Sequence, residues 1–266
     1  MIRVAIRVAR EHAAPVLAEL LELVPAGLEE RDVDPTTVEY VLYGAEGELP
    51  AVGAVRAAAG GALVDVDATE LPDDWDERWR SFHRAVDVGA LRVRPPWEPP
   101  RDGALDVVID PGRAFGTGSH ASTRLTLALL ERLEPAGAIA DWGCGSGILA
   151  VAAARLGWSP VLACDIDAAS IDATRAAAAA NGVAVEVGRC NLRRGGGPWA
   201  PTVLANLVRP LLLELAAHLE RPPRRLIASG LLVGEVADVV AAFAPHGLRE
   251  GERREAAGWA AVELVA

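Results

Sequence analysis

The sequence predicts an α/β protein with a doubly wound, mostly parallel sheet in its larger part and a small α+β domain before it. From Leu105 onward, short apolar runs with strand character alternate with amphipathic segments of helical period, an order typical of βαβ units. The first 66 residues instead contain strand-like alternation on either side of one helical segment, which is typical of a small α+β module. With 266 residues, of which 51% are hydrophobic, the chain can fill a core in each part.

Residues 1–66 form the predicted small domain. The run IRVAIRV at 2–8 alternates as a strand does, residues 13–23 have the period of a helix, and VEYVLYG at 38–44 is a further strand. No motif that carries chemistry falls in this domain. A role in recognising a substrate and a role in packing alone therefore both stay open.

Residues 67–100 form the predicted connection between the two domains. Within LPDDWDERWRSFHRAV, the residues Trp75, Trp79 and Phe82 recur at i, i+4 and i+7, the spacing of one helix face that packs against a neighbour. The proline-rich RVRPPWEPPRDG that follows predicts a stiff connection at the surface.

Residues 101–266 form the predicted doubly wound domain, in which a ligand is expected beyond the carboxyl ends of the strands. The predicted strands are 105–110, 138–142, 161–165, 185–188, 202–207 and 225–230, with a terminal pair at 248–255 and 258–265. The predicted helices are 119–133, 147–156, 168–180, 210–219 and 232–243.

Charge and composition narrow the classes of partner. A net charge of −11 disfavours broad binding to nucleic acid and suits a basic protein partner, while plain solubility explains it equally well. No apolar run reaches the roughly 18 residues of a membrane span, and the first residues lack the apolar core of a signal peptide. We therefore expect a cytoplasmic protein without a membrane partner.

Cysteine and lysine usage excludes two kinds of chemistry. Cys144, Cys164 and Cys190 stand far apart without a CxxC pair, so we expect reduced thiols and no metal site. Lysine is absent, and all 26 basic residues other than histidine are arginine. No lysine side chain of this chain can therefore act as a nucleophile or be modified.

The stretch DWGCGSGILAVAAARLG, residues 141–157, predicts a strand, a bare turn and a helix. Gly143, Gly145 and Gly147 let a ligand approach the main chain closely. A dinucleotide site would have its third glycine where this chain has Ile148, and a phosphate loop would need a lysine. The pattern therefore predicts a ligand of the nucleotide class, and its spacing is GxGxG, headed by Asp141.

Asp165 stands at the end of the next predicted strand, 18 residues after Gly147. A carboxylate there can accept hydrogen bonds from both hydroxyls of a ribose. Asp167 is expected to cap the following helix instead. Together with the glycine pattern, Asp165 resembles the S-adenosylmethionine site of Rossmann-like methyltransferases.

A longer motif makes the resemblance specific. The stretch VIDPGRAFGTGSHASTRLTLALLERL at 108–133 is similar to the signature loop of the ribosomal protein L11 methyltransferase family. The similarity continues through CDIDAASIDATRAAAAANGV, LANL, SGLL and, before the large domain, GLEERDV and DWDERWRSFHRAV. It covers nearly the whole chain and implies a Rossmann-like methyltransferase domain, S-adenosyl-L-methionine as cofactor, and methylation of amino groups on a basic ribosomal protein.

The resemblance also implies roles for single residues. Thr123, Gly143, Asp165 and Asn206 would line the cofactor and the active site, and Phe115 and Thr117 would belong to a loop that closes on it. Asn206 is the predicted catalytic residue, because its amide oxygen can accept a hydrogen bond from the reacting amine without carrying charge.

Each role has a plainer alternative. Asn206 can simply end a strand, Thr123 can satisfy the backbone of its helix, and Phe115 can pack the loop rather than cover a sulfonium. His120 is a candidate general base, but a histidine at a helix start is more often structural.

Three features depart from the family pattern. Ser122 stands where relatives often have threonine, Arg209 follows ANLV, and residues 188–199, near the expected adenine, are glycine-rich.

Rival functions also stay open. A methyltransferase of another protein lysine or of a small amine would have the same large domain. A nicotinamide oxidoreductase or a silent binding protein fits the motifs less well.

Overall fold

The computed structural model describes residues 2–24, 28–44, 49–70, 83–111, 118 and 120–266. The chain forms two compact units, residues 1–82 and residues 83–266. Most of the aromatic helix predicted around Trp75, Trp79 and Phe82 lies outside the described residues. Within the described part of the chain, no helix is long and apolar enough to span a bilayer.

The first unit is an antiparallel sheet of order β2-β3-β1-β4 with two helices. Its described elements are β1 (Ile2–Ala9), α1 (Ala13–Leu23), β2 (Glu29–Asp34), β3 (Thr37–Gly44), α2 (Val52–Ala59) and β4 (Leu63–Glu70). The three elements predicted here, two strands and one helix, are confirmed. The sequence pattern missed β2, α2 and β4. The acidic residues of β2 and β4 hide the alternation, because edge strands bury few side chains.

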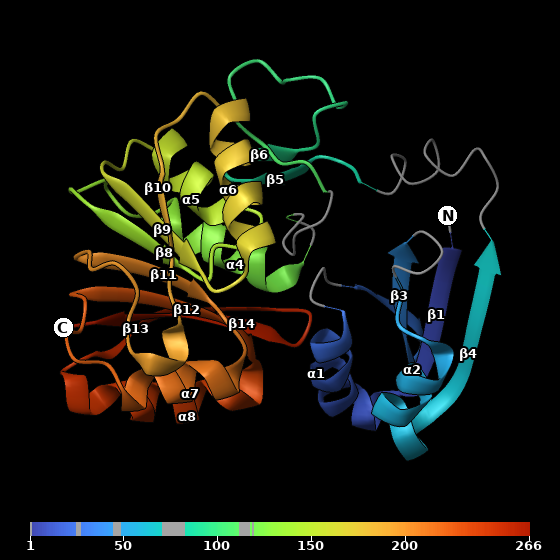
Figure 1. The fold of residues 1–266 in the computed structure, drawn as a ribbon. Helices are drawn as coiled ribbons and strands as arrows, with labels where there is room; N and C mark the ends of the chain where they lie inside the picture. Colours follow the sequence, from blue (N-terminus) through green and yellow to red (C-terminus); the bar gives the residue numbers. More distant parts are fainter. Residues whose placement is uncertain (1, 25–27, 45–48, 71–82, 112–117, 119) are drawn as a thin grey trace. The chain divides into compact units, whose positions relative to one another are not determined.

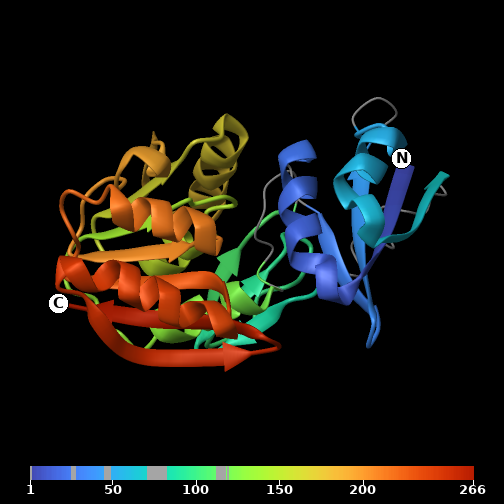
Figure 2. The ribbon, with the colours of Figure 1, turned by 90° about the horizontal axis from the view of Figure 1, so that it is seen from below.

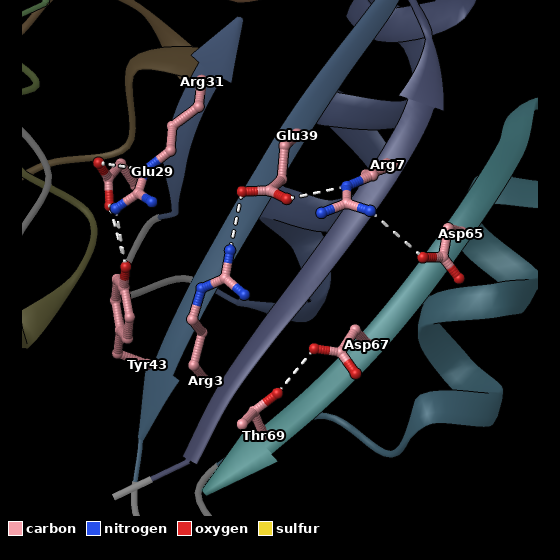
Figure 3. A network of polar contacts seen from close by, with 9 residues as sticks. All are labelled: Arg3, Arg7, Glu29, Arg31, Glu39, Tyr43, Asp65, Asp67 and Thr69. Carbon is pink, nitrogen blue, oxygen red and sulfur yellow. Dashed lines mark hydrogen bonds and ion pairs between the residues drawn. The ribbon is translucent and has the colours of Figure 1, made fainter. Parts of the chain in front are cut away.

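Alternation along β1 and β3 gives this sheet two different faces. Val4, Ile6 and Val8 pack with residues of α1, β3 and α2 in an apolar cluster. The opposite face has a network of charged side chains (Figure 3), in which Glu39, only 5% exposed, accepts hydrogen bonds from Arg3 at 2.8 Å and from Arg7 at 3.0 Å. Hydrogen bonds from these arginines offset the cost of burying the carboxylate.

The second unit begins with a small sheet of order β5-β6-β7. Its strands are β5 (Val86–Val88), β6 (Leu91–Arg94) and β7 (Leu105–Val108). β5 and β6 fall within the residues that the sequence predicts as a connection. β7 confirms the strand predicted at 105–110, but it pairs with β6 and is not part of the main sheet.

The main sheet has seven strands in the order β10-β9-β8-β11-β12-β14-β13. The first five strands are parallel to one another, and β14 is antiparallel to both β12 and β13. Figure 2 shows the β13–β14 hairpin in red along one edge. The strands are β8 (Ile139–Trp142), β9 (Val161–Asp165), β10 (Glu186–Arg189), β11 (Thr202–Asn206), β12 (Arg225–Leu232), β13 (Arg249–Ala256) and β14 (Trp259–Val265).

Helices cover both faces of this sheet, so the predicted doubly wound architecture is confirmed (Figure 1). Ile139 of β8 belongs to the apolar cluster that includes α4 and α5, whereas the next residue, Ala140, belongs to the cluster of α7 and α8. The chain order reverses between β8 and β11, which is where such sheets bind ligands. The helices are α4 (Ala121–Leu130), α5 (Ile148–Arg155), α6 (Ala168–Ala180), α7 (Arg209–Ala217) and α8 (Val236–Phe243).

The cysteines correct one prediction. Cys164, near the end of β9, and Cys190, just after β10, form a disulfide with their Cα atoms 5.7 Å apart. The expectation of reduced thiols is therefore wrong for this pair. β9 and β10 are neighbouring parallel strands, so their ends meet although 26 residues separate the two cysteines. Cys144 is buried and free.

Candidate active site

The turn after β8 is shaped by glycine. Gly143 and Gly147 have φ angles of 80° and 81°, which residues with a Cβ rarely adopt. At Gly147 an added Cβ would lie 2.8 Å from the Cα of Thr174 in α6. The N–H groups of Gly143 and Cys144 both donate to the carbonyl of Cys164, at 2.8 and 3.1 Å. These contacts hold the turn against the end of β9.

Asp165 lies beside this turn, as the motif spacing predicts. Its Oδ2 accepts a hydrogen bond from the N–H of Gly145 at 3.0 Å, and its Oδ1 accepts one from the N–H of Asp167 at 3.0 Å. Each carboxylate oxygen has a second lone pair, so Asp165 can still accept two hydroxyl protons. The prediction that Asp167 caps α6 is confirmed, since its carboxylate accepts from the N–H of Ser170 at 3.1 Å.

Asp141 is buried beneath the turn, with 1% of its surface exposed. Its Oδ2 accepts from the N–H of Ala150 at 3.1 Å. Gly147, which precedes α5, has no side chain that could cap the helix, so Asp141 satisfies this N–H from the preceding strand. Its Oδ1 has no hydrogen-bond partner among the described residues. Burial raises the pKa of Asp141 to about 7, against the lowering effect of the bond from Ala150.

The structure brings Thr123 and Asn206 together, although 83 residues separate them. Asn206 ends β11, and Thr123 is buried in the first turn of α4. The Asn206 Nδ2 donates to the Thr123 Oγ1 at 3.2 Å. This bond leaves the carbonyl oxygen of the Asn206 amide available as an acceptor.

His120 begins α4, and it contributes to the helix start. Its Nδ1 accepts a hydrogen bond from the N–H of Ser122 at 3.3 Å and lies 2.8 Å from the Ser122 hydroxyl. Its ring contacts Trp259 edge-on, with the ring centroids 4.5 Å apart. Burial lowers the pKa of His120. These contacts give the structural role that the sequence favours for this histidine.

Two further residues lie close to Asn206, Leu207 directly after β11 and Ser229 in β12, and no local sequence signal gave them a role. The side chain of Leu207 occupies the space that a Cβ at Gly143 would need, 2.5 Å from that position. Ser229 of β12 is fully buried, and its carbonyl accepts a hydrogen bond from the N–H of Leu207 at 2.9 Å. They lie within LANL and SGLL, two of the segments through which the family resemblance continues.

Some of the predicted positions do not enter this geometry. Phe115 and Thr117 lie outside the described residues. Arg209, one departure from the family pattern, pairs with Asp238 of α8 at 2.6 Å. A hollow of about 420 Å³ over β9 and β10 is lined by residues that include Cys164, Cys190 and Gly197, but not Asp165 or Asn206. Its lining includes residues 188–190 and 196–198, which belong to the glycine-rich segment expected near the adenine.

The residues at the carboxyl ends of β8, β9 and β11 fit one kind of ligand. The glycine turn admits close approach of a flat or bulky group, Asp165 suits a ribose, and the unpaired, buried Asp141 Oδ1 suits a nearby positive charge. S-adenosylmethionine combines a ribose with cationic groups and has no phosphates. This fold and this site together define the class of Rossmann-like, S-adenosylmethionine-dependent methyltransferases.

Comparison with known proteins places the chain more closely. The family model described as "Ribosomal protein L11 methyltransferase (PrmA)" matches residues 49–266. The chain belongs to this family.

Relatives and a solved structure agree with this assignment. A ribosomal protein L11 methyltransferase of Chromohalobacter salexigens is 34% identical over 94% of this chain and 95% of that protein. One of Pelotomaculum thermopropionicum is 40% identical over 81% and 72%, and one of Symbiobacterium thermophilum is 38% identical over 71% and 65%. The match thus spans somewhat less than two thirds of the Symbiobacterium protein. A crystal structure of ribosomal protein L11 methylase from Lactobacillus delbrueckii subsp. bulgaricus superimposes with a TM-score of 0.59 and 28% identity, over 68% of this chain and 98% of that chain.

Proposed function

We propose that this protein transfers methyl groups from S-adenosylmethionine to amino groups of ribosomal protein L11. The observation that carries the proposal is the Thr123–Asn206 pair, which lies at the carboxyl end of β11 beside the glycine turn within a member of this family. With a ribosomal protein as substrate, the proposed place of action is the cytoplasm.

Each residue of the proposed cofactor site would contact a different part of the cofactor. Asp165 would accept hydrogen bonds from the ribose hydroxyls, and the main chain at Gly143 to Gly147 would lie against the ligand. Asp141 would offer its carboxylate to the positive charge. When bound, the cofactor supplies a methyl group activated by its sulfonium.

Asn206 would act on the other reactant. A lysine amine must be neutral to attack, and for an ordinary lysine this costs roughly 4 to 5 kcal/mol at pH 7. The Asn206 amide oxygen would accept a hydrogen bond from that amine and orient its lone pair, while Thr123 fixes the amide. A neutral acceptor suits this task because a carboxylate would favour the protonated amine. Correct alignment of two reactants is itself a large source of rate enhancement.

The distribution of charge supports a basic protein substrate held by the first unit. Residues 1–82 contain seven arginines and seventeen acidic residues, whereas residues 83–266 contain nineteen arginines and twenty acidic residues. Nearly all of the net negative charge therefore belongs to the smaller unit. A surface of one sign attracts a partner of the other sign and speeds encounter, so we assign substrate recognition to residues 1–82.

Mass spectrometry of unmethylated L11 incubated with the protein and S-adenosylmethionine tests the proposal. We expect mass gains in steps of about 14 Da on L11, and a KM for L11 that rises with ionic strength because salt screens the acidic unit. Methylation of a small amine, measured in parallel, would lack this salt dependence. The enzyme has no lysine, so methylation of its own lysine side chains cannot confuse the result. Gains on a small amine or another protein, with none on L11, would refute the proposed substrate.

The raised pKa of Asp141 predicts a pH dependence of cofactor binding. A positive ligand favours the ionised carboxylate, whose pKa is about 7 in the free protein. Below that pH, binding must displace a proton, so the Kd for S-adenosylmethionine should rise by up to about tenfold per pH unit. About one pH unit above that pKa and higher, this contribution should vanish. Isothermal titration calorimetry in buffers of different ionisation enthalpy would measure both the Kd and the proton release.

The Asp141→Asn variant is the matched control for that titration. Asparagine keeps an acceptor for the Ala150 N–H and does not titrate. Its Kd should be weaker at neutral pH and nearly constant as the pH falls. A wild-type Kd that does not change between about pH 7 and about pH 5 would contradict a role for Asp141 toward the positive charge.

A further inference from the structure

Ser229 holds a position from which it can control both members of the Thr123–Asn206 pair. We propose that Ser229 is a positioning residue for methyl transfer, which acts through Thr123 and Asn206 without touching either reactant. The inference rests on the proposed function, since it assigns Asn206 the task of orienting the amine. Ser229 is 0% exposed, so its hydroxyl cannot reach a substrate.

The side chain of Ser229 fixes the start of α4. Its Oγ lies 3.1 Å from the carbonyl oxygen of Ser122 and 3.2 Å from that of Ala260 in β14, and it can donate to both. A hydroxyl has one proton, so these are two branches of one shared donor. Ser122 immediately precedes Thr123. The Ser229 hydroxyl therefore links the turn that carries Thr123 to the sheet.

The main chain at Ser229 fixes the end of β11. Asn206 and Ser229 are opposite one another in the parallel pairing of β11 and β12, and the Ser229 carbonyl accepts from the N–H of Leu207 at 2.9 Å. The next residue, Gly230, has a φ of +81°, and a Cβ there would lie 2.5 Å from the carbonyl oxygen of Leu207. The chain that leaves Asn206 thus packs directly against the main chain of β12.

The bonds from Ser229 to Ser122 and from Leu207 to Ser229 together set the geometry of one hydrogen bond in the candidate site. The Asn206 Nδ2 and the Thr123 Oγ1 are 3.2 Å apart, and Ser229 holds the residue next to each of them. If the Ser229 hydroxyl is removed, α4 can shift relative to β11 while Asn206 keeps its strand pairing. The amide would then lose its orientation, and a small misplacement of a reacting group is costly in rate.

Thr126 provides a matched control. Its Oγ1 donates to the same carbonyl of Ser122 at 2.9 Å, and it is also 0% exposed. This bond lies within α4 and does not connect the helix to β12. Thr126→Val removes a buried hydroxyl from the same acceptor at nearly constant volume, so it reproduces the loss of a hydrogen bond without the loss of the link.

The test compares the full-length Ser229→Ala and Thr126→Val variants by kcat, by KM for L11 and by calorimetric Kd for S-adenosylmethionine. We expect Ser229→Ala to lower kcat by about tenfold with an unchanged cofactor Kd, and Thr126→Val to keep the wild-type kcat. In an Asn206→Ala background, Ser229→Ala should cause little further loss, because the two residues act as one unit. Ser229→Cys, which keeps a weak donor, should be intermediate, and it replaces Ser229→Ala if that variant does not bind cofactor.

Two results would overturn the inference: a Ser229→Ala kcat equal to that of the wild type, or a loss that multiplies fully with that of Asn206→Ala. Failure of the proposed function looks different. In that case Asn206→Ala itself would retain the wild-type kcat, or L11 would gain no mass with any variant.

Discussion

Asn206→Ala is expected to reduce kcat on L11 by about 10²- to 10³-fold, the usual cost of losing one preorganised polar group in an active site. Alanine removes the amide oxygen proposed to orient the amine and leaves the Thr123 hydroxyl without its donor. The Kd for the cofactor should stay near the wild-type value, because Asp165 and the glycine turn are untouched. Single-turnover mass spectrometry of L11, with cofactor binding measured on the same preparation, would check both expectations.

Asn206→Asp is the control that separates acceptor geometry from charge. Aspartate keeps an acceptor oxygen of similar position but favours the protonated amine. Its rate should therefore be low at neutral pH and should recover as the pH rises. A wild-type rate in Asn206→Ala, or equal rates for alanine and aspartate at every pH, would remove Asn206 from the proposed mechanism.

Asp165→Ala should have the largest effect on cofactor affinity. Hydrogen bonds to a charged group contribute about 1.5–3 kcal/mol each, and two ribose hydroxyls are proposed to use this carboxylate. The Kd for S-adenosylhomocysteine, a probe that excludes turnover, should rise by about 100-fold or more. In the wild type, the Asp165 carboxylate also accepts a hydrogen bond from the N–H of Gly145 at 3.0 Å. The variant loses this bond, so the glycine turn loses one of its attachments.

Asp167→Ala is the matched comparison, because its carboxylate lies two residues away and caps α6. Loss of that cap should lower the free energy of unfolding by about 1 kcal/mol and leave the Kd nearly unchanged. Calorimetric titration together with thermal unfolding of both variants would distinguish them. An Asp165→Ala protein that binds as tightly as the wild type would assign the ribose to other residues.

The edge strands β2 and β4 of the first unit, and the small β5–β7 sheet, show where a local sequence pattern fails to predict structure. β4 contains LVDVDATE, whose acidic residues stand on a largely exposed edge. A pattern method needs a buried face, and an edge strand has little of one. β6 lies just before a proline-rich run, and each of its residues pairs with a residue of β7 that lies 14 positions further along the chain.

Sequence alone sufficed to predict the alternation of strands and helices, the bare turn at Gly143 to Gly147, the carboxylate of Asp165 beside it, and the cap at Asp167. Each of these follows from neighbours within a short stretch, so period and spacing suffice. The folded structure was needed to show that Thr123 contacts Asn206, that Ser229 holds the residue beside each of them, and that Cys164 is joined to Cys190. It was also needed to show that Asp141 is buried deeply enough to raise its pKa to about 7. These features depend on which strands become neighbours and on what covers them, and short-range sequence patterns predict neither.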